Sequence, residues 1–278
     1  AGAPPRTTTR VSVETAELDY RPSYLAAALA GLAVFVLYML TLAPTTSMWD
    51  TSEYIAAAYV LGIPHPPGNP FFVLIGRVFA ILPIAPSVAM RINILAAVSS
   101  AISAGFWFLV TERVLVGWLP RRWQRIVGGC MAVLIGATSF TVWNQSVVNE
   151  KVYTVSLLGL AVICWLTVRW CDDPEDKIGD RLLVLISYIL GIGYANHMAG
   201  MLAAPAVGLA PRIRRPMFLL RWKLLVACGA ALVRLLENSL SPGTGGEGGG
   251  EGGYRMAPHP SPLSASGARE KRRIAFHS

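Results

Sequence analysis

Two carboxylates and a histidine lie close together in a proline-rich part of the sequence. Asp50 and Glu53 stand three residues apart, and His65 follows within the run Pro64-His65-Pro66-Pro67-Gly68-Asn69-Pro70. A carboxylate facing a cleft could accept a proton from a hydroxyl or bind a divalent metal, and a histidine could relay a proton or hold a phosphate oxygen. The spacing of Asp50 and Glu53 also fits a capping box at a helix start, which would hold a carboxylate rigidly.

Two further polar groups occur later in the chain. Glu150 and Tyr153 lie in the loop from Asn144 to Thr154, and Asn196–His197 separates two short apolar segments. Each group could be an ordinary solvated loop, but polar side chains that dip below a membrane surface are costly and tend to be functional. The sequence therefore predicts Asp50 and Glu53 as catalytic candidates. The candidates for substrate binding are His65, Asn69, Arg77, Glu150, Tyr153, Asn196 and His197.

The composition is that of a membrane protein. Hydrophobic residues make up 54% of the 278 residues, and only 14% are charged, whereas soluble proteins carry about 25% charged residues. The net charge of +8 comes mostly from short Lys/Arg clusters between apolar runs, a pattern that sets orientation in a bilayer and argues against a nucleic-acid partner. The four cysteines fit neither a zinc site nor a disulfide framework. We expect an all-α, multi-pass integral membrane protein.

A bilayer core takes about 20 apolar residues of helix, and the sequence offers six or seven such segments. The predicted spans lie near residues 24–42, 93–116, 126–143, 154–170, 182–195 and 198–210, with a seventh at 219–235 weakened by Arg221, Lys223 and Arg234. They form a transmembrane domain over 23–235, after a cytoplasmic segment of residues 1–22.

The segments 182–195 and 198–210 could form one long helix or a tight hairpin. One arginine cluster follows the second span, and another follows these two segments. Both clusters can be cytoplasmic only if an even number of spans separates them, and counting the two segments as separate spans of a hairpin gives an even number. This topology places a long loop, residues 43–90, on the outer side. Its apolar pieces Ile55–Leu61 and Phe71–Leu82 are too short to span and are predicted to lie along the membrane surface.

The composition changes abruptly near the end of the chain. Residues 236–278 include the glycine-rich run Gly243–Gly253 and a basic run, Arg269–Arg273. Such a segment cannot bury a core, so we expect it to be disordered. A reading-frame shift or a truncated gene model would explain the change, and another reading frame of the DNA would then continue an apolar sequence.

The run from Trp49 to Ala58, followed by Leu61 to Pro70, resembles the bacterial membrane family called domain of unknown function 2723, which is related to the animal protein O-mannosyltransferase transmembrane protein 260. The segments Trp143–Gln145, Glu150–Thr154 and Gly191–His197 also resemble family segments. The resemblance implies a glycosyltransferase of the C superfold that uses a sugar linked to a lipid phosphate. Family members continue with more spans beyond the point that corresponds to Leu235.

Carried onto this chain, the resemblance implies that Asp50 is the active-site carboxylate, with Glu53 as the second choice. His65, Glu150 and His197 fall at family-typical positions. The expected reaction moves a sugar from a polyprenyl-phosphate donor to a hydroxyl of a protein or glycan acceptor, as in O-mannosylation of Ser or Thr. The expected location is the periplasmic side of a bacterial inner membrane. The sequence requires no cofactor and leaves a divalent metal open.

Two other functions fit the same residues. A transporter or flippase for a lipid-linked or small polar substrate would use these polar groups as a binding site, and a non-catalytic assembly subunit would use them in no chemistry. A transporter should place polar residues along several spans near mid-bilayer. Here they gather at the outer face, which favours the enzyme.

Overall fold

The computed structural model describes residues 20–46, 50–66, 68–148, 152–172 and 179–214. Its regular elements within these ranges are all helices, and no strand occurs among them, which confirms the all-α class. These residues belong to the first of two compact units, residues 1–223, while the second unit, residues 224–278, lies outside the described ranges. The predicted disordered tail and the seventh span therefore also lie outside them.

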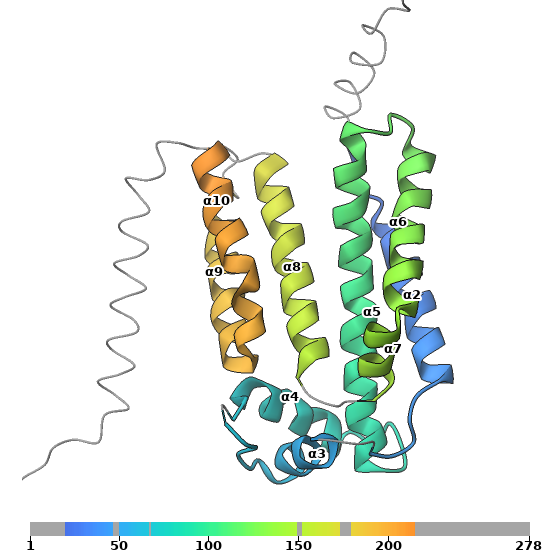
Figure 1. Ribbon diagram of the computed structural model, residues 1–278, viewed down its shortest axis with the longest axis vertical. Coiled ribbons are helices and arrows are strands. Elements are labelled where there is room, and N and C mark those ends of the chain that lie inside the picture. Colours follow the sequence, from blue (N-terminus) through green and yellow to red (C-terminus); the bar gives the residue numbers. More distant parts are fainter. Residues whose placement is uncertain (1–19, 47–49, 67, 149–151, 173–178, 215–278) are drawn as a thin grey trace, which may run out of the picture. The chain divides into compact units, whose positions relative to one another are not determined.

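Helix α5 (Val88–Val114) is the central helix of the bundle and packs against α2 (Tyr24–Leu40), α6 (Arg122–Thr138) and α8 (Tyr153–Asp172) (Figure 1). Its 27 residues are rich in Ala, Ser and Gly, and small residues allow helix backbones to approach closely in lipid. Helices α2 and α5 approach closely, since a Cβ on Gly31 would lie 2.9 Å from the main-chain oxygen of Ala101.

Among the described residues, two helices are long and apolar enough to cross a membrane: Val88–Gly117, which joins α5 to the 3₁₀ turn Leu115–Gly117, and α8. A third candidate is α6 together with α7 (Phe140–Val147), but this pair is bent by 68°. The predicted span 126–143 is therefore not one straight helix. The break lies at Ser139, between the end of α6 and the start of α7. Here the Thr138 hydroxyl donates to Leu134 O, and the Ser139 hydroxyl donates to Gly136 O. Such back-bonding bends helices because it competes with their main-chain hydrogen bonds.

The described part of residues 43–90 contains two short helices, α3 (Thr51–Val60) and α4 (Pro70–Ile81), which lie across one end of the bundle (Figure 1). Both predicted apolar pieces are thus helical, although α3 begins earlier than expected. The two helices bury a common core against the first turns of α5, formed by Tyr54, Ile55, Ala58, Phe72, Ala80, Ile92 and Leu95. The start of the loop is fixed by Asn93, whose amide donates to Ala43 O at 2.9 Å and Thr45 O at 3.2 Å.

The chain reverses after α9 (Gly179–Asn196). His197 is extended, and it is followed by a 3₁₀ helix, η2 (Met198–Ala203), and by α10 (Ala204–Arg214). The backbones of Gly193 and Gly200 touch, since a Cβ on Gly200 would lie 2.8 Å from the main-chain oxygen of Gly193. The predicted segments 182–195 and 198–210 therefore fall in separate helices on either side of a turn at His197.

A buried carboxylate ties helices together at the other end of α5. Glu112 is fully buried and accepts hydrogen bonds from the Ser23 hydroxyl at 2.6 Å and the Ser23 main-chain N–H at 2.9 Å. The Arg122 guanidinium donates to the same Ser23 hydroxyl. Nearby, Arg113 forms an ion pair with Asp172 at 2.6 Å. These contacts join the start of α2 to the end of α5, the start of α6 and the end of α8.

Candidate active site

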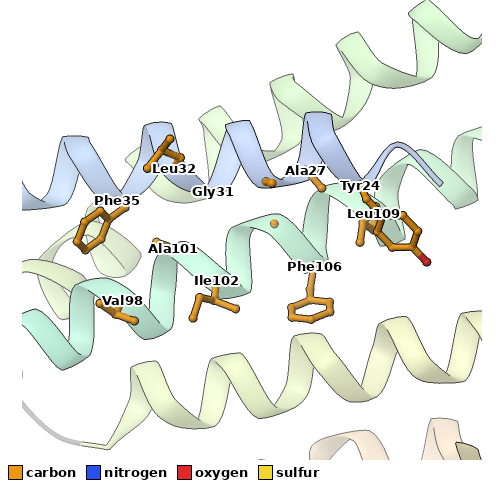
Figure 2. A pocket seen from close by; sticks show the side chains of 12 residues that line it. Tyr24, Ala27, Gly31, Leu32, Phe35, Val98, Ala101, Ile102, Phe106 and Leu109 are labelled. Atoms are coloured by element: carbon orange, nitrogen blue, oxygen red, sulfur yellow. The ribbon is translucent and has the colours of Figure 1, made fainter. Parts of the chain in front are cut away.

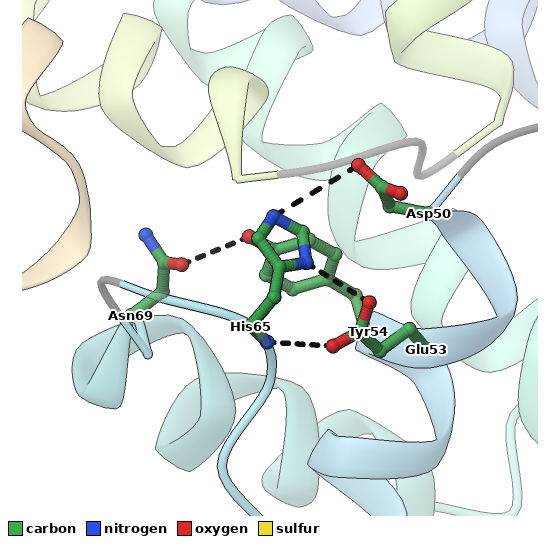
Figure 3. Close-up of polar contacts among 5 residues, drawn as sticks. All are labelled: Asp50, Glu53, Tyr54, His65 and Asn69. Carbon is green, nitrogen blue, oxygen red and sulfur yellow. Dashed lines mark hydrogen bonds and ion pairs between the residues drawn. The ribbon is translucent and has the colours of Figure 1, made fainter.

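The structure brings Asp50, Glu53 and His65 together at the start of α3 (Figure 3). Glu53 accepts two hydrogen bonds from His65, one from the ring Nδ1 at 2.9 Å and one from the main-chain N–H at 2.6 Å. The other ring nitrogen, Nε2, lies 4.0 Å from the Asp50 carboxylate. His65 therefore stands between the two carboxylates that the sequence predicted as catalytic candidates.

The predicted capping box does not form. Asp50 does occupy the N-cap position of α3, and its main-chain carbonyl accepts from Tyr54 N–H at 3.1 Å, but its side chain makes no capping hydrogen bond. Both carboxylate oxygens of Glu53 bond to His65 instead of returning to Asp50. Glu53 bonds to His65 because His65 offers two N–H donors, one from its ring and one from its main chain, whereas the backbone of the N-cap residue offers only one. The carboxylate of Asp50 is consequently left to face His65.

Electrostatics fix which atoms carry protons in this cluster. The hydrogen bonds from the His65 ring and backbone lower the pKa of Glu53 below its usual range, so Glu53 is ionised at neutral pH. An ionised carboxylate can only accept hydrogen bonds, so Nδ1 of His65 must carry a hydrogen. Nε2 is then the atom that faces Asp50, and it can take up a proton or donate one when the ring is protonated.

The same three side chains could instead hold a divalent cation. Their ligand atoms all lie within 4.8 Å of one another, and Asp50, Glu53 and His65 are each partly exposed. Carboxylate and imidazole ligands suit several divalent transition metals. Nδ1 would have to release its hydrogen to bind an ion alongside Glu53, so the hydrogen-bonded state and that metal-bound state exclude each other.

A buried chain of hydrogen bonds starts behind this cluster. The Tyr54 hydroxyl donates to Asn69 Oδ1 at 2.9 Å, and the Asn69 amide donates to the main-chain oxygen of Asn196. The Asn196 amide in turn donates to Val152 O at 3.1 Å and to the Ser156 hydroxyl at 2.8 Å. Asn69 and Asn196, both predicted as substrate contacts, are only 1% and 2% exposed. They join the loop to α8 and α9.

Tyr54 and Ser156 are members of the site region that the sequence did not single out. The Tyr54 ring packs edge to face against both His65 and Phe72, with ring centres 5.6 Å apart in each pair. The sequence did not indicate a role for Tyr54 in the site, because an aromatic residue in a short helix usually belongs to the hydrophobic core. Ser156 lies inside an apolar run, where a serine is more often a contact between helices than part of a site.

The remaining candidates lie apart from the cluster. The Arg77 guanidinium donates to the main-chain oxygen of Tyr59 and lies over the Tyr59 ring, so it connects α4 to the end of α3. Tyr153 and His197 pack edge to face at 5.5 Å, and Nδ1 of His197 accepts from the Ala199 N–H at 3.1 Å. Glu150 lies outside the described residues.

Cavities in the described bundle are separate from the acidic cluster. A groove of about 630 Å³ runs along α2 and α5, where Ala27, Gly31, Ala101 and Gly105 leave space, and its lining is apolar (Figure 2). A smaller cavity of about 240 Å³ between α5, α7, α8 and η2 includes Tyr153 and Ser156 in its wall. Neither is lined by Asp50, Glu53 or His65.

Acidification should loosen the loop that carries His65. The folded state lowers the pKa of Glu53. The stabilisation that the Glu53 carboxylate gives to the fold is therefore fully present above the pKa of a free glutamate, about 4.3. It is lost as the pH falls through the lower pKa of the folded state. The His65 main-chain N–H reports this directly, since its neighbours Pro64, Pro66 and Pro67 have no N–H. We expect its hydrogen exchange, relative to an unfolded peptide, to accelerate only at acidic pH.

The Glu53→Gln variant is the control for this pH effect. Glutamine does not ionise at acidic or neutral pH. The His65 N–H of the variant should therefore exchange faster than that of the wild type at neutral pH, and the difference should shrink on acidification. Equal exchange in the two proteins at neutral pH would contradict the role given to Glu53.

The fold and the site together define a class: helical proteins whose apolar helices can cross a membrane and whose polar side chains gather where two short helices cover one end of the bundle. The chain belongs to the family of the protein O-mannosyl-transferase TMEM260 N-terminal domain, whose model matches residues 50–217. The predicted family resemblance is thereby confirmed, and the matched segment begins at Asp50.

Two curated relatives carry the same name. The chain is 28% identical over 165 residues to protein O-mannosyl-transferase TMEM260 of Mus musculus, covering 59% of this chain and 22% of the mouse protein. It is 27% identical over 174 residues to the Dictyostelium discoideum protein of that name, covering 58% and 20% of the two chains. The chain thus spans about a fifth of these relatives. Their names support a glycosyltransferase in general terms. No solved structure matches the chain.

Proposed function

We propose that this protein is a membrane glycosyltransferase that moves a sugar from a lipid-phosphate-linked donor to an acceptor hydroxyl, as in protein O-mannosylation. The observation that carries the proposal is the placement of Asp50 beside His65, at the start of the segment that matches the family. A general base must be within reach of the proton that it removes. Asp50 is partly exposed at the end of the bundle, where a lipid-borne donor and a water-borne acceptor can both arrive.

In the proposed step, the acceptor oxygen forms a bond to C1 of the sugar while the bond from C1 to the phosphate oxygen breaks. The bonding electrons leave with the lipid phosphate, and the hydroxyl proton passes to Asp50. His65, whose ring is oriented by Glu53, faces Asp50 and can take the proton onward. Once protonated, it would stabilise the negative charge left on the released lipid phosphate.

The membrane arrangement belongs to the same proposal. We infer a C-superfold-like bundle of six or seven spans, a polyprenyl-phosphate donor, and an active site on the periplasmic face of a bacterial inner membrane. In support, Ile92 packs under α3 and α4, and Glu112 lies 20 residues further along α5, which is about 30 Å or one hydrocarbon thickness. Beyond Glu112, Trp118 and Trp123 are 79% and 59% exposed beside Arg121 and Arg122, a composition typical of a cytoplasmic interface.

A transporter is the second candidate, because hydroxyl groups do occur within the bundle. Ser99, Ser100 and Ser103 of α5 are buried, and Ser100 borders two cavities, of about 240 and 310 Å³. Two of these hydroxyls are already used between helices, since Ser146 donates to Ser100 at 2.8 Å and Ser103 to Leu157 O at 3.3 Å. Such bonds are common between membrane helices. The sequence between Arg91 and Glu112 also carries no charge, so the enzyme remains favoured.

A transfer assay on spheroplasts, which keep the inner membrane intact but lack the outer one, tests both the reaction and its side. Spheroplasts that express the protein receive a Ser/Thr-rich acceptor peptide that cannot cross the inner membrane, and the peptide is then analysed by mass spectrometry for added hexose. We expect modification of the external peptide without permeabilisation, because the base lies on the outer face. Cells without the gene are the control.

The outcomes separate the alternatives. Modification only after permeabilisation would place the site in the cytosol and overturn the outer-face proposal. No modification on either side, together with gene-dependent movement of a lipid-linked sugar between leaflets, would replace the enzyme by a flippase.

A further inference from the structure

We propose that Asn69 and Asn196 are positioning residues that clamp the His65 loop, residues 61–66 and 68–69, onto the end of α9. The catalytic consequence of this clamp rests on the proposed function, whereas the clamp itself can be tested without any activity. Neither asparagine is expected to touch substrate, because both side chains are buried.

Both polar atoms of the Asn69 side chain make a hydrogen bond. Its Oδ1 accepts from the Tyr54 hydroxyl at 2.9 Å, and its amide donates to the main-chain oxygen of Asn196. One bond holds the loop to α3 and the other holds it to α9, across 127 positions of sequence. A buried polar group is costly when left without a partner, so both bonds favour a single position of the loop.

The backbone of the loop needs such a clamp. Leu61 and Asn69, at its two ends, both have left-handed backbone conformations, with φ of 56° and 42°. Asparagine tolerates this region, but for leucine it is unfavourable. Strained conformations persist only when the surrounding structure holds them in place. The loop also turns through Gly68, whose φ is 86°. His65 lies between these strained positions, so its location depends on how the ends are held.

On the other side of the clamp, the Asn196 side chain fixes the orientation of its own peptide. Its Nδ2 donates to Val152 O and to Ser156 Oγ at the start of α8. Its Oδ1 is buried without a hydrogen-bond partner in the described part of the chain, so the two donated bonds determine how the amide lies. The loop, α8 and α9 therefore meet at one residue.

The clamp reaches the proposed catalytic groups through Tyr54. The same tyrosine whose hydroxyl bonds to Asn69 packs its ring edge to face against His65. Displacing Asn69 should therefore shift His65 relative to Asp50 and Glu53. Misplacing a catalytic group by about 1 Å can reduce a rate by about a hundredfold. The loss should fall on kcat, with the KM for the acceptor nearly unchanged, because no substrate contact is removed.

The decisive variant is Asn69→Asp, which preserves the shape of the side chain and the acceptor for Tyr54. It replaces the amide that donates to Asn196 O by an oxygen that cannot donate when ionised. In the full chain, reconstituted in lipid nanodiscs, we expect the His65 main-chain N–H to exchange with deuterium several-fold faster at neutral pH. Amides of α6 should keep the wild-type rate, which distinguishes a released loop from general unfolding.

Two further variants complete the test. Tyr54→Phe removes only the hydroxyl, so we expect a smaller increase in the exchange rate of the His65 N–H. If Asn69→Asp does not fold, the exchange rate in Tyr54→Phe tests the clamp instead. Asn144→Asp makes the same chemical change on the exposed side of α7 and should leave His65 exchange unchanged. An unchanged rate at His65 in both Asn69→Asp and Tyr54→Phe would overturn the clamp.

The activity measurement separates this inference from the proposed function. If Asn69→Asp lowers kcat by roughly 10- to 100-fold at constant KM, the positioning role is supported. If transfer is lost in neither Asp50→Asn nor Asn69→Asp, the proposed catalytic site fails, while the exchange result still decides whether the clamp exists. Full kcat in Asn69→Asp, with Asp50→Asn inactive, would overturn the positioning role alone.

Discussion

Replacing Asp50 by Asn should reduce sugar transfer by roughly 10²- to 10⁴-fold, the range by which general acid–base groups accelerate reactions. Asparagine has the shape of aspartate but cannot take the proton from the acceptor hydroxyl. Asparagine also keeps an oxygen that can accept hydrogen bonds, so the substitution should leave folding and expression intact. The loss should appear in kcat when hexose on the acceptor peptide is measured as a function of time.

The matched control is Asp180→Asn, which makes the same change at an exposed acidic residue in the first turn of α9 and should retain full transfer. Glu53→Gln should have an intermediate effect, because it weakens the orientation of His65 without removing the base. Undiminished transfer in Asp50→Asn would exclude Asp50 as the base, and abolished transfer in Glu53→Gln would then assign that role to Glu53.

The substitution Gly31→Val should cause a large loss of stability. A Cβ at this position would lie 2.9 Å from the main-chain oxygen of Ala101, and a backbone atom cannot move aside as a flexible side chain would. The helices α2 and α5 must therefore separate, and overpacking of this kind typically costs about 1–3 kcal/mol. Thermal unfolding of the protein in detergent should show a lower midpoint, followed by loss of folded protein at moderate temperature.

Gly159→Val provides the comparison for this stability effect. Gly159 lies in the middle of α8, and a Cβ there would meet nothing within 4 Å. Its unfolding midpoint should stay close to that of the wild type. Similar losses in the two variants would show that valine itself, rather than the contact between α2 and α5, causes the effect.

The helical class and the chemical candidates could be predicted from sequence because both depend on local patterns. Apolar runs of helical length indicated the positions of α2, α5 and α8, and the prolines around His65 marked an ordered turn. Asp50, Glu53 and His65 were therefore named as candidates from sequence, and the structure brings their side chains together, while their roles stay a prediction. The partner of Glu53 was not predicted, because the three-residue spacing that fits a capping box gives no indication of a bond to His65, 12 positions further along the chain.

The long-range contacts could not be predicted. Asn69 and Asn196 lie 127 positions apart, and nothing in either segment indicates that one amide bonds to the main chain of the other. Their polarity suggested contact with substrate, whereas the fold buries them as partners. The 68° bend between α6 and α7 was missed for a related reason: a periodic apolar run does not reveal where serine and threonine hydroxyls compete with the helix backbone.

The contact between Ser23 and Glu112 can form only late in the synthesis of this part of the chain. The two residues are 89 positions apart, and the helix that packs along α2 is α5, which is made only after the whole segment containing α3 and α4. With ribosomes adding about 5–20 residues per second, translation between these residues takes roughly 4–18 seconds. During that interval α2 has left the ribosome without its main partner, so the nascent chain depends on the insertion machinery or on surrounding lipid to shield it.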